Sequence, residues 1–407
     1  MKFKTVLFGV MASYCLNSAT HAAFTEDTTA NLYLKNFYFN RNFDDSNSKD
    51  LSNWSQAATL TVSSGYTDTS LQLGLDVSAR YAYRLSPAKN IIDNVMPYDT
   101  AKQQQAQDQL KLGATAKFKY SNTELKIGEV IPKLPIVHTD TAMQLPTTFL
   151  GGILESTDFA NTKITAGRLT KVSGRNAEDY YKFQLTNGQN KAQSDALDFA
   201  GFDYDFSHQQ LRYFYAKLED IYDQHFLSYE LRHDFNADTH LKSNFYIFDT
   251  MESGDALEGD IDNQVYAMIH MLNYGNHGFG LGYKYVTGDN AFPLLANWVP
   301  QVYSANWSVG TFMQQDERSW QVRYDYDFKD TPLNGLKSII RYYDGSHIKT
   351  ATGNDGTEKE LDLILNYDFQ QQKLKGLGAS WLIADYKNSV AKDYLENRVA
   401  LYYNYKF

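Results

Sequence analysis

The chain has 407 residues, an aromatic content of 15 % and a formal net charge of −10 at neutral pH. It contains no run of 18 apolar residues, whereas a transmembrane helix needs about 20, so a helical membrane protein is excluded. The acidic balance, with a sequence pI near 5.4, also excludes a typical nucleic-acid-binding protein, whose partner is a polyanion.

The first 22 residues are predicted to be a secretory signal peptide. Lys2 and Lys4 make the start positive, the stretch from Thr5 to Leu16 is apolar, and small residues flank a cleavage site after Ala22. This order of segments is typical of exported proteins. The single cysteine, Cys15, lies inside this segment, so the predicted mature chain forms no disulfide. We expect residues 23–407 to fold as one domain.

After the signal peptide, the dominant pattern is an alternation of apolar and polar residues. Every second residue is apolar in 71–83, and the pattern returns in 110–120, 320–328, 361–369 and 399–407. Such alternation places the two sets of side chains on opposite faces of a β-strand. The segments also reach the length of about nine to eleven residues that crosses a bilayer with tilt, whereas strands of soluble proteins average about five or six.

A soluble sandwich and an outer-membrane barrel both produce this alternation. The barrel is favoured because aromatic residues gather at the strand ends and because Arg, Lys and Asp lie deep within the strands, where a water-filled lumen suits them. The sequence therefore predicts an all-β fold, a transmembrane antiparallel β-barrel of about 18 strands, with about 16 strands as the alternative.

Basic residues in the polar phase of these strands are predicted to form a path of cations along the lumen. A solute carboxylate would pass between them by charge-assisted hydrogen bonds, for which the planar guanidinium group is well shaped. The alternative is that they only solvate the lumen and pair with neighbours such as Asp325 and Asp327. Lys111, Arg212 and Arg232 share this phase; the selected candidates are Arg80, Arg84, Lys117, Lys119, Arg168, Arg323, Arg341 and Arg398.

The segment from Gly128 to Gly152 is irregular and carries three of the eight prolines. Proline is excluded from central strands, and long ordered loops usually have a function. We expect this loop to fold into the lumen and narrow it; the alternative is an external surface loop. The candidate residues of this constriction loop are Pro132, Leu134, Pro135, Asp140, Pro146 and Phe149, with Asp316 and Glu317 as acidic candidates that face either the constriction or the external solvent.

Several runs of residues match the pattern of a known family. They are Pro132-x-Leu134-Pro135, Asp140, Leu145-Pro146-x-x-Phe149, Thr165-Ala166-Gly167-Arg168 and Asp316-Glu317-Arg318-Ser319-Trp320-Gln321. In their order and spacing the sequence resembles the OprD-type substrate-specific outer-membrane porins of Gram-negative bacteria. The resemblance implies a monomeric barrel, a pore narrowed by the third and seventh loops, and passive uptake of small carboxylates past a row of basic side chains, without a cofactor.

Two departures from the family pattern bear on the solute. Met143 and Gln144 stand where the third loop often has arginine, and Ala379-Ser380-Trp381-Leu382 stands where the penultimate strand often has alternating arginines. We therefore expect aromatic or hydroaromatic acids of the benzoate, vanillate or quinate type. Basic amino acids or small peptides are the alternative solutes.

Other functions are weaker predictions. A barrel enzyme would need a nucleophile motif such as G-x-S-x-G, which is absent from the sequence, so we expect no enzyme. The histidines show no metal-binding spacing, and no metal or cofactor is expected. A receptor without transport stays open as an alternative. The expected partners are small organic acids and outer-membrane lipid, and no nucleic acid is expected.

Overall fold

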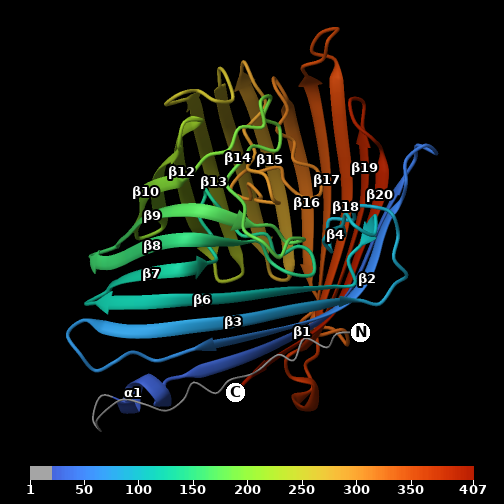
Figure 1. Cartoon of the computed structure of the whole chain (residues 1–407). Coiled ribbons are helices and arrows are strands. Elements are labelled where there is room, and N and C mark those ends of the chain that lie inside the picture. Colours follow the sequence, from blue (N-terminus) through green and yellow to red (C-terminus); the bar gives the residue numbers. More distant parts are fainter. Residues whose placement is uncertain (1–20) are drawn as a thin grey trace.

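The computed structural model describes residues 21–407, which form a closed barrel (Figure 1). Within these residues, 18 antiparallel strands make one continuous sheet, and each strand pairs with its neighbours in sequence. The first and last strands pair from Asn31 and Lys406 to Phe43 and Tyr394, which closes the ring. Closure leaves no unpaired edge facing lipid. The predicted barrel and its strand number are confirmed.

The barrel strands are between 8 and 15 residues long. They are β1 (Thr29–Phe43), β2 (Leu51–Ser63), β3 (Gln72–Arg84), β6 (Asp108–Tyr120), β7 (Thr123–Val130), β8 (Thr148–Phe159), β9 (Thr162–Ser173), β10 (Leu197–Phe206), β11 (Gln209–Leu218), β12 (Tyr222–Asn236), β13 (Thr239–Glu252), β14 (Asp262–Tyr274), β15 (His277–Gly288), β16 (Arg318–Asp327), β17 (Leu336–Ile348), β18 (Gly356–Asp368), β19 (Leu377–Asn388) and β20 (Tyr394–Lys406).

Three small features complete the secondary structure of the described residues. They are the helix α1 (His21–Glu26), the hairpin of β4 (Tyr98–Asp99) and β5 (Gln104–Gln105), and the 3₁₀ turn η1 (Gln372–Leu374). None of the helices in residues 21–407 has the length and apolar composition needed to span a membrane. The predicted signal peptide lies outside the described residues, except for His21 and Ala22 in α1.

The alternation of the sequence becomes the two faces of the wall. On β3, Leu73, Leu75 and Val77 are exposed on the outer face, while Arg80 and Arg84 are 3 % exposed on the inner face. An outward apolar band contacts lipid, and inward polar groups contact the lumen. The periodicity of the sequence therefore assigns the faces of this strand correctly.

The two ends of the barrel differ. At the turn end, short connections such as 121–122, 160–161 and 207–208 join the strands, and β1 begins and β20 ends there. At the loop end, four long connections, here called L2 (85–107), L3 (131–147), L4 (174–196) and L7 (289–317), leave the wall. In outer-membrane barrels the short turns face the periplasm.

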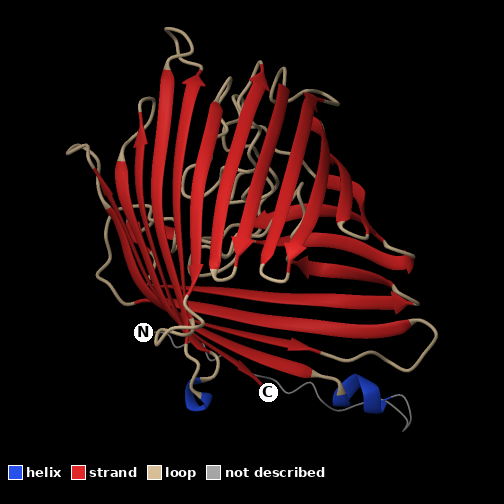
Figure 2. Cartoon of the chain, turned by 180° about the vertical axis from the view of Figure 1, so that it is seen from behind, coloured by secondary structure: helices blue, strands red, loops and turns tan. Residues whose placement is uncertain are grey.

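The long loops fold into the barrel and build a core there, visible as loop segments inside the ring of strands (Figure 2). The inner faces of β10 to β13 carry apolar rings, and the Phe226 and Phe248 rings lie 4.6 Å apart. Ile136 of L3, Phe183 of L4 and Phe292 of L7 pack in the same cluster. The lumen is therefore not polar all round, as the outer-membrane pattern suggested, because one side of it is an apolar core shared by wall and loops.

Candidate functional site

L3 crosses the lumen as predicted, but it is shorter than the irregular segment in the sequence. Gly128 belongs to β7, and Phe149 belongs to β8, where it is fully buried on the inner wall. Pro132, Leu134 and Pro135 lie in the entering arm of the loop. Asp140 is 7 % exposed at its centre, and Pro146 lies in the returning arm.

Two buried lysines of the wall tether this loop. Lys111 on β6 donates hydrogen bonds to three backbone carbonyls, those of Pro146 (3.0 Å), Ser173 (3.2 Å) and Gly174 (3.0 Å). Lys35 on β1 donates to the carbonyl of Met143 at 2.5 Å. Lys111 shares the phase of the predicted cation path, but its ammonium group is occupied by backbone, so it positions L3 rather than meeting solute.

At the centre of L3, Asp140 forms an ion pair with Arg175 of L4. The guanidinium group of Arg175 also stacks over the indole of Trp298 from L7, at 4.1 Å from the ring centroid. The Nε of Arg175 also donates to the Asn94 carbonyl of L2 at 3.0 Å. Arg175 therefore joins all four inward loops. Asp140 interacts electrostatically with Lys35, Arg175 and Arg398. Three cations therefore act on one carboxylate where L3 crosses the lumen.

Three arginines on β16, β17 and β20 form a basic wall at this level. Arg323 lies directly across from Arg341 in the strand register. Arg323 binds Asp325 on its own strand through two hydrogen bonds of 2.7 Å, and Arg398 binds Glu396 at 2.5 Å. Arg341 has no ion-pair partner among residues 21–407; its one hydrogen bond reaches the Tyr343 hydroxyl at 3.5 Å, and its Nε is buried without an acceptor.

The row of arginines is interrupted where the sequence departs from the family pattern. On β18 the residue across from Arg341 is Asp362, and β19 contributes the inward-facing Leu382 and Ala384 rather than a base. The basic wall resumes at Arg398. The basic wall therefore consists of the neighbours Arg323 and Arg341 and, beyond β18 and β19, of Arg398.

The other predicted members of the cation path are already engaged. Arg80 pairs with Glu129 at 2.7 Å, Arg84 donates to the Ala106 carbonyl of L2 at 3.0 Å, and Lys117 pairs with Asp76 at 2.6 Å. Lys119 lies 5.6 Å from the centroid of the Tyr66 ring. Arg212 and Arg232 also pair with carboxylates. These groups line the inner wall, but their charges are largely compensated.

The structure places Arg168 on the outer face, contrary to the prediction. It is exposed and pairs with Asp198 (2.8 Å) and Glu219 (3.1 Å) at the loop end. The inward positions of β9 are Thr165 and Leu169, which are both buried. The surrounding sequence mixes small, apolar and polar residues in both phases, so it did not define the inner face there.

The predicted acidic candidates do not line the constriction either. Asp316 lies at the loop end, where its carboxylate accepts a hydrogen bond of 3.2 Å from the side-chain amide of Asn354. Glu317, the last residue of L7, is fully buried. The acidic groups near the basic wall include Asp140, Asp325, Asp362 and Glu396. Three basic residues, Lys35, Arg41 and Arg175, were not predicted from the sequence. Lys35 and Arg41 alternate on β1 with Phe37 and Phe39 on the same inward face, and the two phenylalanines obscured its polar character. Arg175 lies in L4, which has no periodicity.

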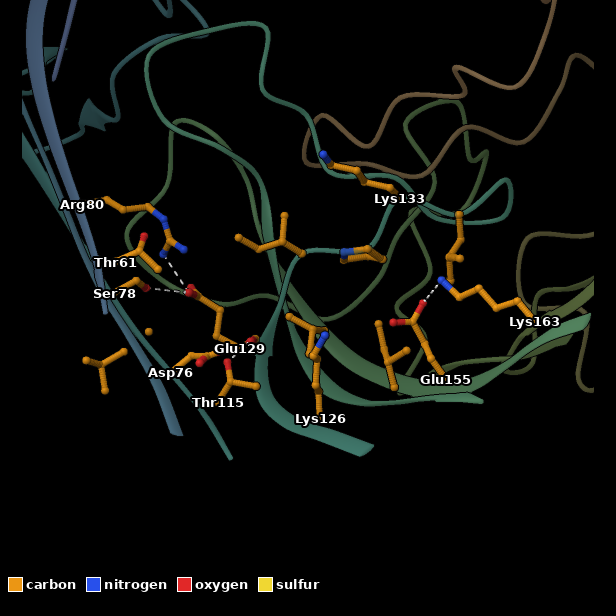
Figure 3. Close-up of a pocket in the computed structure, with 17 residues that line it drawn as sticks. Thr61, Asp76, Ser78, Arg80, Thr115, Lys126, Glu129, Lys133, Glu155 and Lys163 are labelled. Atoms are coloured by element: carbon orange, nitrogen blue, oxygen red, sulfur yellow. Dashed lines mark hydrogen bonds and ion pairs between the residues drawn. The ribbon is translucent and has the colours of Figure 1, made fainter. Parts of the chain in front are cut away.

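A cavity of about 390 Å³ opens on the turn-end side of L3 (Figure 3). In it, Arg80 and Ser78 point to Glu129, and Glu155 points to Lys163. Lys133 projects from L3 over the same space and has no ion-pair partner among the described residues. Charged side chains of the inner wall therefore also line the lumen on the turn-end side of L3.

Replacing Asp140 by Asn is expected to make the channel more selective for anions. The substitution removes the negative charge that pairs with Arg175 and acts on Lys35 and Arg398 while keeping the shape of the side chain, so the local positive potential rises. We expect the anion-to-cation permeability ratio to rise roughly two- to threefold, measured from reversal potentials across a KCl gradient. An unchanged ratio would show that ions do not pass this cluster.

Comparison with known proteins gives a consistent picture. The family model described as outer membrane porin, OprD family, matches residues 22–407. The porin-like protein GalP of Pseudomonas putida is 29 % identical over 92 % of this chain and 90 % of its own length. The crystal structure of OccAB4 from Acinetobacter baumannii is similar with a TM-score of 0.90, 36 % identity and coverage of 93 % of this chain and 98 % of that one. That of Pseudomonas aeruginosa OpdK with vanillate has a TM-score of 0.89 and 31 % identity, covering 94 % and 100 %.

Proposed function

The chain belongs to the OprD family of outer-membrane porins, and from this premise we propose that it passes small organic anions, chiefly aromatic or hydroaromatic carboxylates. Porins of this family are channels of the bacterial outer membrane and not enzymes, so uptake is diffusion down a gradient. We also propose that residues 1–22 are removed on export and that the barrel acts as a monomer in outer-membrane lipid.

The observation that carries the proposal is that Arg341 forms no ion pair with a carboxylate among residues 21–407. Its neighbours Arg323 and Arg398 each pair with a carboxylate on their own strand, whereas Arg341 makes no such pair and lies between Arg323 on one side and Asp362 on the other in the strand register. Like charges directly opposite one another on a sheet are destabilising. A solute carboxylate at Arg341 relieves that repulsion and supplies the acceptor that its buried Nε lacks.

The apolar part of the lumen supports an aromatic solute. An aromatic acid has a charged end and an apolar ring. This lumen has a basic wall on one side, and on another the partly buried side chains of Tyr246, Tyr303 and Trp307 cover the apolar cluster of wall and loops. Burial of apolar surface in transit lowers the barrier for the ring, while the arginines hold the carboxylate. The related OpdK was crystallised with vanillate, an acid of this chemical class.

A second candidate is a basic amino acid or small peptide. It is favoured by Asp362, which is fully buried, lies across from Arg341 in the register, and has one carboxylate oxygen without a hydrogen-bond partner in the described residues. A solute with an ammonium and a carboxylate group would find Asp362 as the acceptor and Arg341 as the donor side by side.

Solute permeation into liposomes that contain the purified protein separates the two candidates. Benzoate, quinate, arginine and a neutral sugar of similar size are compared at equal concentration. Faster permeation of the two acids supports the organic-anion channel, and faster permeation of arginine supports the second candidate. Equal permeation of all four would contradict both, because it would show a pore without charge selection.

A further inference from the structure

L7 is held against the wall by ionisable groups that have no contact with the lumen. Lys284 on β15 is fully buried. It donates to the Ser304 hydroxyl (3.2 Å) and to the backbone carbonyls of Asn306 (2.5 Å) and Thr311 (2.9 Å), all in L7. Because three acceptors of one loop meet one ammonium group, Lys284 fixes the middle of L7.

Two glutamates lie together behind the C-terminal end of the same loop. Glu317, the last residue of L7, is fully buried, and Glu358 on β18 is 2 % exposed. Glu317 accepts a hydrogen bond from the backbone N–H of Gln314 at 3.0 Å. Glu358 accepts from Asn388 at 3.2 Å and from the Tyr386 hydroxyl. In each glutamate these donors reach only Oε2, and Oε1 has no hydrogen-bond partner among the described residues.

The space for the two carboxyl groups is left by a glycine on the strand between them. A Cβ at Gly345 on β17 would collide with Oε1 of Glu317 and would lie 3.1 Å from Cγ of Glu358. The two carboxyl groups interact with each other both electrostatically and as hydrogen-bonding partners. Lys284 acts on both carboxyl groups from β15. On β18, Glu360 is the next buried residue of the same face as Glu358 and accepts from the backbone N–H groups of Val309 and Gly310. The neighbouring strand β17 contributes Gly345, and β19 contributes Tyr386 and Asn388.

Two buried carboxyl groups that reach each other as hydrogen-bonding partners do not both ionise readily, since burial and mutual repulsion both oppose the second negative charge. One proton between them gives an acceptor and a donor to the two oxygens that lack partners. We propose that Glu317 and Glu358 share a single proton, that Lys284 balances the remaining negative charge, and that this pair is the latch that positions L7 at the constriction. The inference goes beyond the proposed solute class and does not depend on it.

The latch makes the position of L7 depend on pH. Burial, followed by the charge of Glu358, raises the pKa of Glu317 to about 9. The latched state keeps this proton up to a pH of about 9, whereas a carboxyl group released into water loses it near its ordinary pKa. The latch is therefore fully stable below the ordinary carboxyl pKa, loses stability as the pH rises between the two values, and has lost all of this stabilisation at about pH 9. Above it, two buried negative charges repel, and Glu317, at the junction of L7 and β16, is driven toward water. We expect L7 to loosen and the pore to widen.

Single-channel conductance in planar bilayers, recorded from about pH 6 to about pH 10, tests the latch because this range lies above the ordinary carboxyl pKa. We expect the wild-type conductance to rise with pH across this range and to level off above the Glu317 pKa of about 9. In Glu358→Gln the amide donates to Glu317 at every pH, so the rise should disappear. A wild-type trace that stays flat, or a rise that persists in Glu358→Gln, would overturn the proposal.

Two further variants keep the test decisive. Glu258 is a buried glutamate that accepts from the backbone N–H groups of Asn190 (2.7 Å) and Ala192 (2.5 Å) in L4 and has no carboxyl partner. Glu258→Gln should therefore keep the wild-type rise. Gly345→Ala should displace Glu317 by sterics alone and raise the conductance already at neutral pH. Heat-modifiable gel mobility verifies that each barrel is folded, and a folded Gly345→Ala channel with wild-type conductance would also contradict the latch.

Discussion

Replacing Arg341 by Gln is expected to slow the permeation of benzoate about tenfold, the effect of losing about 1.4 kcal/mol from one charge-assisted contact. Permeation of a neutral sugar should stay unchanged, because Gln keeps most of the side-chain volume. The physical reason is that Arg341 is the arginine of the basic wall that forms no ion pair with a carboxylate of the described chain. Liposome permeation with both solutes gives the measurement.

The matched control for this variant is Arg168→Gln. Arg168 is an arginine of the same barrel, but it lies on the outer face with Asp198 and Glu219. Benzoate permeation should be the same as in the wild type. If both variants slow benzoate equally, the effect comes from barrel stability or net charge and not from a contact in the lumen.

Replacing Lys111 by Met is expected to release L3 and enlarge the pore. Met fills a similar volume but leaves three carbonyls without their donor: that of Pro146 in L3 and those of Ser173 and Gly174 where β9 runs into L4. Each buried acceptor left unsatisfied costs about 1–3 kcal/mol, so the loop should leave its buried position for water. We expect a conductance several-fold above that of the wild type, together with weaker discrimination between benzoate and arginine.

Lys359→Met is the control for this second variant. Lys359 faces outward on β18 and pairs with Asp344 at 3.0 Å, so the same chemical change there should leave conductance and selectivity unaltered. Hydrogen exchange of residues 131–147 supplies an independent readout. A Lys111→Met channel with normal conductance and a protected L3 would show that the packing of the apolar cluster, rather than the lysine, holds the loop.

Local patterns were sufficient to predict the wall of the barrel. The alternation on β3 assigned Leu73 and Leu75 to the outer face and Arg80 to the inner face, as the structure has them. The prolines of 128–152 marked the loop that enters the lumen. These features are predictable because a strand has a period of two and because proline cannot donate to the sheet.

The same patterns did not identify which charges are free. Arg80, Arg323 and Arg341 look alike in the sequence, but Arg80 is paired with Glu129, Arg323 with Asp325, and Arg341 with no carboxylate among the described residues. Pairing across strands depends on the register, and pairing with L3 or L4 depends on where those loops settle. Neither is encoded in the residues adjacent to an arginine.

By itself, then, the sequence determined an all-β barrel with an inward loop and basic residues on inward positions of its strands, because these follow from residue order over a few neighbours. The tertiary structure alone decided that L4 and L7 also fold inward, that an apolar core fills one side of the lumen, and that Glu317 lies behind L7 rather than in the pore. Those outcomes depend on contacts between segments more than a hundred residues apart, such as Lys35 with Met143 and Thr147 with Asn297, and such contacts leave no periodic signal in the chain.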